Sequence, residues 1–109
     1  MKQTDLQGLI QETKAEKGLI FNSEGQLIDS YGMTKDNNAA AMANMIVTMS
    51  NEFFQDTLAI ESLKQIVLTS DQGLAIINKY DDDHIVCLLT NDISKAAMIK
   101  LSLRQIVLQ

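Results

Sequence analysis

The chain has 109 residues, of which 46% are hydrophobic, and it carries a formal net charge of −5. This composition excludes a disordered chain, and the excess of acidic residues argues against a nucleic-acid partner, which requires a basic surface. Cys87 is the only cysteine, so an internal disulfide is excluded. We expect one domain over residues 1–109, located in the cytoplasm and without direct membrane insertion, because no apolar run approaches the ~20 residues of a membrane span.

The first thirty residues predict a short helix followed by a β-hairpin. Residues 4–15 place apolar side chains at helical spacing, with Thr4 as the expected N-cap: Leu6, Leu9 and Ile10. Two short apolar runs, GLIF and QLID, then flank a polar turn that ends in Gly25. A phosphate-binding loop needs several glycines and a lysine at the start of a helix. The single glycine followed by a strand predicts a turn with Gly25 in the left-handed conformation.

Residues 34–57 predict a long helix, capped by Asp36 or Asn37 and rich in alanine. On a helical wheel its apolar residues span about 220°, whereas covering one face of a sheet takes little more than about 100°. Phe53 falls near the centre of the face expected to pack on the sheet. Three methionines lie on one flank of that face: Met42, Met45 and Met49. We therefore expect a partner to cover this flank, because methionine suits surfaces that repack against another molecule.

The last part of the chain predicts three strands, over residues 64–70, 74–80 and 84–90, and a final helix over 93–109 capped by Asn91 or Asp92. The strands are nearly continuous apolar runs, which indicates burial on both faces. With three helices available to cover them, the predicted fold is a three-layer α/β/α sandwich of order α-β-β-α-β-β-β-α. The final helix carries a second apolar patch, formed by Ala97, Leu101 and Leu108. We expect this patch to pack against a neighbouring element or molecule.

The strand over residues 64–70 has only Lys64 to protect it from pairing with another strand. If it lies at an edge of the sheet, two copies could pair across a two-fold axis and bury the methionines beside the seam. The predicted dimer interface comprises Met42, Met45, Met49, Lys64, Gln65, Ile66, Val67 and Leu68.

Two motifs that could suggest chemistry have simpler explanations. In the run from Asp81 to His84, three consecutive acids cannot all face one ion, and His84 is the only histidine, so a solvated hairpin tip is expected. Cys87 lies between apolar residues, which favours buried packing over nucleophilic chemistry. The sequence shows no Ser-His-acid set. We expect no catalytic residue, no metal site and no cofactor, and hence no enzymatic activity.

A family resemblance is carried by the runs GLIFNSEGQLIDSYG, AAAMANMIVTM, IVLTSDQGLAII and HIVCLL, followed by an amphipathic helix. In this order and spacing they resemble the roadblock / dynein light-chain family, including its bacterial gliding-motility-regulator-like members. The resemblance implies a profilin-like fold with a five-stranded antiparallel sheet. It also implies a homodimer or heterodimer in which the strand after the middle helix pairs with its copy and the two middle helices lie side by side. The loop TNDISKAAM lacks the glycine and arginine that many members carry there, so a ligand contact through this loop is in doubt.

Members of this family do no chemistry themselves and act as platforms for Ras-like small GTPases, as motor adaptors or as scaffolds. We therefore expect a homodimer that binds a Ras-like small GTPase, with stimulation of GTP hydrolysis left open. Arg104 is the only arginine, so any stimulation is expected to reposition the GTPase's own groups. The alternatives are a scaffold or adaptor without effect on turnover, and a small-ligand sensor. The expected partner-binding positions are Ala41, Asn44, Thr48, Asn51, Glu52 and Gln55.

Overall fold

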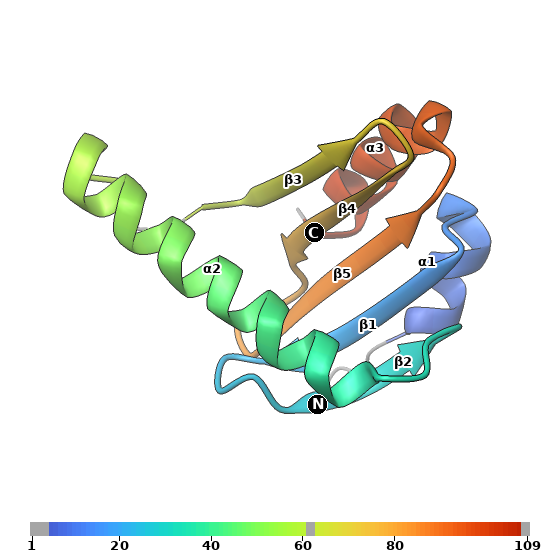
Figure 1. Ribbon diagram of the computed structural model, residues 1–109, viewed down its shortest axis with the longest axis horizontal. Coiled ribbons are helices and arrows are strands. Elements are labelled where there is room, and N and C mark those ends of the chain that lie inside the picture. Colours follow the sequence, from blue (N-terminus) through green and yellow to red (C-terminus); the bar gives the residue numbers. More distant parts are fainter. Residues whose placement is uncertain (1–4, 61–62, 108–109) are drawn as a thin grey trace.

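The computed structural model describes residues 5–60 and 63–107 and has a five-stranded antiparallel sheet covered by helices on both faces (Figure 1). The strands are arranged in the order β2-β1-β5-β4-β3. Along the chain the elements are α1 (Leu6–Thr13), β1 (Lys17–Asn22), β2 (Leu27–Tyr31), α2 (Asp36–Leu58), β3 (Gln65–Ser70), β4 (Gly73–Lys79), β5 (His84–Thr90), the short 3₁₀ helix η1 (Ile93–Lys95) and α3 (Ala96–Val107). The predicted fold class and order of elements are confirmed.

Two hydrophobic clusters lie on opposite faces of the sheet and account for its three layers. Because successive side chains of a strand point to opposite faces, Val86 and Leu88 of β5 pack with α1 and α3, whereas Cys87 packs with α2. Strands β1, β4 and β5 are buried on both faces, as their continuous apolar runs predict. Strands β2 and β3 lie at the two edges and remain largely exposed, so the expected burial on both faces is wrong for β3.

The helix boundaries differ from the predicted ones by a few residues. Helix α1 begins after Asp5, whose carboxylate accepts a hydrogen bond from the Gly8 N–H at 3.0 Å, while Thr4 lies outside the described residues. The N-cap of α2 is Lys35 and neither Asp36 nor Asn37. Asp36 instead belongs to the first turn, where its carboxylate accepts a hydrogen bond from the Ser30 hydroxyl at 2.7 Å and ties the helix to β2.

Two local predictions are confirmed at the turns. Gly25 has a φ of 81°, in the left-handed region, and the Asn22 side-chain oxygen accepts hydrogen bonds from the Glu24 and Gln26 backbone N–H groups at 2.9 Å. These contacts close the β1–β2 turn. At the other end of the chain, the Asp92 carboxylate caps η1 by accepting from the Ser94 N–H at 3.0 Å.

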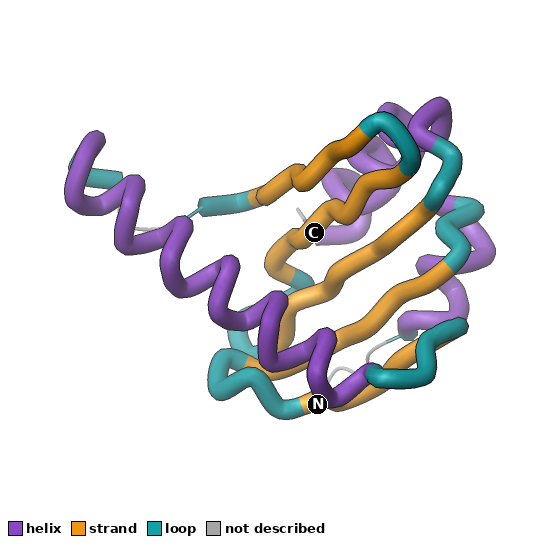
Figure 2. Tube along the Cα trace, viewed as in Figure 1, coloured by secondary structure: helices purple, strands orange, loops and turns teal. Residues whose placement is uncertain are grey.

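Helix α2 crosses its face of the sheet diagonally, and its C-terminal half projects past the ends of the strands (Figures 1 and 2). At 23 residues the helix is about 35 Å long, whereas five strands span only about 19 Å across the sheet. Ala40 and Ala43 are the only buried residues of α2. Their small side chains allow the first half of the helix to approach the sheet closely. Within the described ranges, none of the helices combines the length and apolar character needed to cross a membrane.

Candidate interaction surface on α2 and β3

A continuous apolar stripe runs along α2 on a side that the sheet does not cover. Met42, Met45, Met49 and Phe53 follow one another at intervals of three or four residues and therefore lie on one helix face. Their exposed fractions are 59%, 61%, 64% and 62%, respectively. We call these four residues the methionine stripe. Four large apolar side chains in a row, each more than half exposed, form the kind of contiguous patch that marks an interaction surface.

Strand β3 lies at an edge of the sheet, at the position that the dimer expectation requires. Among the described residues it pairs only with β4, so its other side presents backbone N–H and C=O groups without a strand partner. Val67 and Leu68 are both exposed on this strand, and Lys64 is exposed just before it.

The other two predicted interface residues are only half-buried. Ile66 packs with the cluster beneath α2, and the Gln65 side-chain amide donates a hydrogen bond to the Asn78 side-chain oxygen at 3.1 Å. These contacts anchor the start of β3 to the rest of the domain. The exposed part of the edge therefore consists of Lys64, Val67 and Leu68. Gln65 and Ile66 hold the strand in place.

The six predicted partner-binding positions do not share one environment. Ala41, Thr48, Glu52 and Gln55 are exposed, on the side of α2 opposite its buried alanines. Asn44 and Asn51 are half-buried and face solvent only in part.

Both asparagines have structural contacts within the domain. Asn44 lies so close to the β1–β2 turn that a Cβ atom at Gly25 would be 3.1 Å from its side-chain nitrogen. The Asn51 side-chain oxygen accepts a hydrogen bond from the Leu63 N–H at 3.0 Å. These two positions therefore also have a structural role, and the other four are the more exposed ones.

Phe53 and Leu58 are exposed apolar residues of α2 that are absent from the predicted interface, each with an exposed fraction of 62%. The helical wheel places Phe53 toward the core because it treats the whole helix as lying on the sheet. The structure shows that this part of α2 extends beyond the strands (Figure 1). The predicted helix length, compared with the width of five strands, is the signal that could have revealed this overhang.

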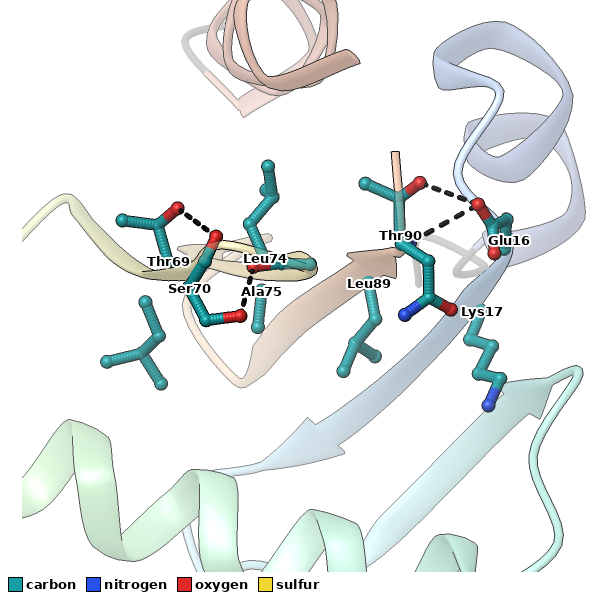
Figure 3. Close-up of a pocket in the computed structure, with 11 residues that line it drawn as sticks. Glu16, Lys17, Thr69, Ser70, Leu74, Ala75, Leu89 and Thr90 are labelled. Atoms are coloured by element: carbon teal, nitrogen blue, oxygen red, sulfur yellow. Dashed lines mark hydrogen bonds between the residues drawn. The ribbon is translucent and has the colours of Figure 1, made fainter. Parts of the chain in front are cut away.

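A depression of about 370 Å³ lies beside the β3 edge and is open to solvent. Its apolar lining comes from neighbouring strands and includes Leu68, Ala75 and Leu89. In Figure 3, Leu89 points to the side of the sheet where α2 lies, whereas Leu74 points to the opposite side. The depression therefore continues the apolar surface of β3 across the part of the sheet that α2 leaves uncovered.

Polar groups at the rim of this depression bond to one another. The Thr90 hydroxyl donates a hydrogen bond to the Glu16 carboxylate at 2.9 Å, and the Asn91 N–H donates to the same oxygen at 3.2 Å (Figure 3). These two contacts join the segment before β1 to the end of β5. Glu16 therefore has a structural role at this end of the sheet.

The motifs that could suggest chemistry are parts of the scaffold. The Asp81 carboxylate lies 2.8 Å from the His84 ring nitrogen Nδ1 and accepts a hydrogen bond from the Asp83 N–H at 2.8 Å, which closes the turn between β4 and β5. Cys87 is buried, as predicted, and burial raises the pKa of its thiol to about 12. Such a thiol is not a nucleophile at neutral pH.

These elements, in this order around a five-stranded antiparallel sheet, have the fold of a roadblock/LC7 domain. The structure is similar to one described as "MglB with tetrameric arrangement", at a TM-score of 0.82 and 11% identity, over 94% of this chain and 79% of that one. It is similar to MglB from Myxococcus xanthus, at a TM-score of 0.79 and 12% identity, over 92% of this chain and 83% of that one. It is also similar to a roadblock/LC7 domain from Streptomyces avermitilis, at a TM-score of 0.73 and 15% identity, over 94% of both chains.

At these identities the likeness is one of fold. The sequence matches no protein-family model and no curated protein. The resemblance drawn from the sequence is thus confirmed at the level of architecture, over almost the whole chain.

Proposed function

We propose that this protein is a non-enzymatic, dimeric platform that binds a Ras-like small GTPase. The observation that carries the proposal is the exposure, in one chain, of the methionine stripe on α2 together with the free edge of β3. Both features expose apolar or unpaired groups that a second copy could cover. The roadblock fold supports the proposal, because the family resemblance implies platforms for small GTPases.

The proposed dimer forms by antiparallel pairing of β3 with its copy across a two-fold axis. This pairing satisfies the free backbone groups of the edge and joins two sheets into one. Val67 and Leu68 then lie at the seam, and the methionine stripes of the two α2 helices cover each other. A two-fold contact uses the same patch on both copies, which fits a surface made of one strand and one helix.

The proposed GTPase-binding surface is the outward side of α2, with Ala41, Thr48, Glu52 and Gln55. These side chains are exposed, and they lie beside the methionine stripe without forming part of it. Pairing of the stripes in a dimer would therefore leave them accessible and would place two such surfaces next to each other.

The experiment that tests this proposal combines the mass in solution with GTPase assays. Sedimentation should give a dimer, and the purified dimer should bind a Ras-like GTPase from the same organism in its GTP form. Single-turnover GTP hydrolysis, measured with increasing amounts of the protein, then shows whether binding changes the rate. Charge reversal by Glu52→Arg should weaken GTPase binding, whereas Glu12→Arg, at an exposed position of α1 on the opposite face of the sheet, should not.

The outcomes separate the alternatives. Binding with faster hydrolysis identifies a GTPase regulator, and binding at an unchanged rate identifies an adaptor without effect on turnover. A monomer, or a dimer that binds none of the organism's Ras-like GTPases, would refute the proposal.

A further inference from the structure

Helix α3 has an exposed apolar face in addition to the face it packs into the core. Ile99 and Leu103 are fully buried, whereas Met98 and Leu101 have exposed fractions of 45% and 55%. Met98 and Leu101 are three residues apart and therefore adjacent on the helix surface, with the small exposed side chain of Ala97 beside them. The second apolar patch predicted at Ala97 and Leu101 is thus present on the surface, while Leu108 lies outside the described residues.

Two cations flank this apolar strip. Between Ile93 and Val107 the sequence has three basic residues and no acidic one, in a chain with a net charge of −5. The Lys95 ammonium group donates a hydrogen bond to the Lys14 backbone carbonyl at 3.0 Å, so this cation holds η1 against the end of α1. Lys100 and Arg104 lie one turn apart on α3, and within the described part of the chain neither forms an ion pair.

We infer that the outer face of α3, formed by Ala97, Met98, Lys100, Leu101 and Arg104, docks an acidic amphipathic helix of a partner protein. The apolar side of such a helix would pack on Met98 and Leu101, and the small Ala97 would let it approach closely. Its carboxylates would pair with Lys100 and Arg104. The charge of this face, opposite to that of the chain as a whole, favours an acidic partner and disfavours a second copy of this chain.

A protein helix fits this face better than a membrane surface does. A helix that lies in a bilayer interface needs a strongly cationic polar side and a broad apolar side. The outer face of α3 offers two large apolar side chains and two cations that form no ion pair with the residues the structure describes, which matches the footprint of one or two helical turns.

The α3 surface and the α2 surface lie on opposite faces of the sheet (Figure 1). A helix bound to α3 would therefore leave α2 and β3 accessible. This inference does not rest on the proposed GTPase function, and either can fail without the other. If both hold, the domain joins two different partners, one on each face.

The test uses two synthetic helical peptides with leucines at positions i, i+3 and i+7. One peptide has glutamates on both sides of the leucine strip, and its twin has lysines there. We expect the glutamate peptide to bind the full-length protein at least about tenfold more tightly than its twin, a factor that corresponds to roughly 1.4 kcal/mol. In NMR spectra of the labelled protein, the amide signals that shift should belong to η1 and α3.

Variants of the exposed Leu101 and Arg104 and of the half-buried Lys100 test the location, because none of the three belongs to the core. Leu101→Ser should weaken binding of the glutamate peptide about tenfold, as expected for the loss of a central apolar contact. Ile28→Ser, at a similarly exposed position on β2, should not. The double variant Lys100→Glu/Arg104→Glu should reverse the preference between the two peptides, whereas Lys79→Glu on β4 should leave it unchanged.

Three results would overturn the inference. Equal affinity for the two peptides would show that charge does not select the partner. Shifts confined to α2 and β3 would place the peptide on the other face. Binding to vesicles of phosphatidylcholine and phosphatidylglycerol, lost in Leu101→Ser, together with no peptide binding, would identify the face as a membrane contact.

Discussion

The side-chain oxygen of Asn51 accepts a hydrogen bond from the Leu63 backbone N–H at 3.0 Å. The two residues are twelve positions apart, and the contact joins the overhanging half of α2 to the segment that enters β3. It fixes the position of the methionine stripe relative to the free strand edge. The two parts of the proposed dimer interface are therefore held together before any partner binds.

Asn51→Ala is expected to destabilise the protein by about 1 kcal/mol, the usual net contribution of one hydrogen bond. It should also weaken the dimer, because the edge strand is no longer held in position relative to α2. Urea unfolding and sedimentation measure the two effects. Gln55→Ala, at an exposed position one turn later, should change stability by less than about 0.5 kcal/mol. Equal stability of the two variants would show that the Asn51 contact contributes nothing.

The variant Met42→Lys/Met49→Lys should be a folded, soluble monomer. Both side chains are mostly exposed in the single chain, so charges there cost little in folding but would be buried in the dimer. Sedimentation gives the mass, and circular dichroism checks the fold. Gln7→Lys/Gln11→Lys adds the same charge on the exposed side of α1 and should leave the mass unchanged. A dimer in the methionine variant would exclude the stripe from the interface.

A lysine placed on each edge of the sheet distinguishes the two edges. Leu68→Lys on β3 should raise the dissociation constant of the dimer by tenfold or more, about 1.4 kcal/mol, because a charge at the seam opposes strand pairing. Ile28→Lys on β2 introduces the same charge at a side chain of similar exposure and should have no effect. Sedimentation over a range of concentrations measures both. If Ile28→Lys alone dissociates the dimer, β2 is the pairing strand.

Ala59→Gly should stabilise the protein by about 0.5–1 kcal/mol. Ala59 ends α2 with a φ of 56°, in the left-handed region, where glycine avoids the strain of a Cβ atom. Ala41→Gly, inside the same helix, should instead lower stability by about 1 kcal/mol. Unfolding of both variants at one protein concentration gives the comparison. A loss of stability in Ala59→Gly would mean that the left-handed cap does not form.

The turn between β4 and β5 should make the free energy of unfolding depend on pH in the acidic range. Burial would raise the pKa of Asp81, but the hydrogen bonds from the Asp83 N–H and His84 bring it below the ordinary value of 3.8. A carboxyl group with a lowered folded-state pKa contributes stability above its unfolded-state pKa and loses it as the pH falls through the folded-state value.

Asp81→Asn should therefore be less stable than the wild type at pH 6, with a difference that shrinks below pH 4, in urea unfolding. Asp82→Asn, on the exposed tip of the same turn, is the matched control for removing one carboxylate. A difference for Asp81→Asn that does not change between pH 6 and pH 3 would contradict the assignment.

Most of the fold could be predicted from the sequence because each element depends on local patterns. Apolar runs locate β1, β4 and β5, and the turn chemistry of Asn22 and Gly25 locates the first hairpin. The exposure of the methionines follows from an apolar arc too wide for one sheet face. The exposure of Phe53 could not be predicted in this way, because it depends on where a long helix crosses a narrow sheet. The partial burial of Asn51 also depends on the path of the chain between α2 and β3, which no local pattern specifies.

The two edges of the sheet differ in a way that limits how the protein can assemble. The register between β1 and β2 shifts at Ile20 and Phe21, and β2 carries Asp29 and Ser30 in its short exposed run. A bulge and polar side chains discourage further strand addition on that side. A sheet that can be extended at only one border stops growing once two copies have met. The register shift in the first hairpin would thus keep a protein that associates through β3 from extending into fibres.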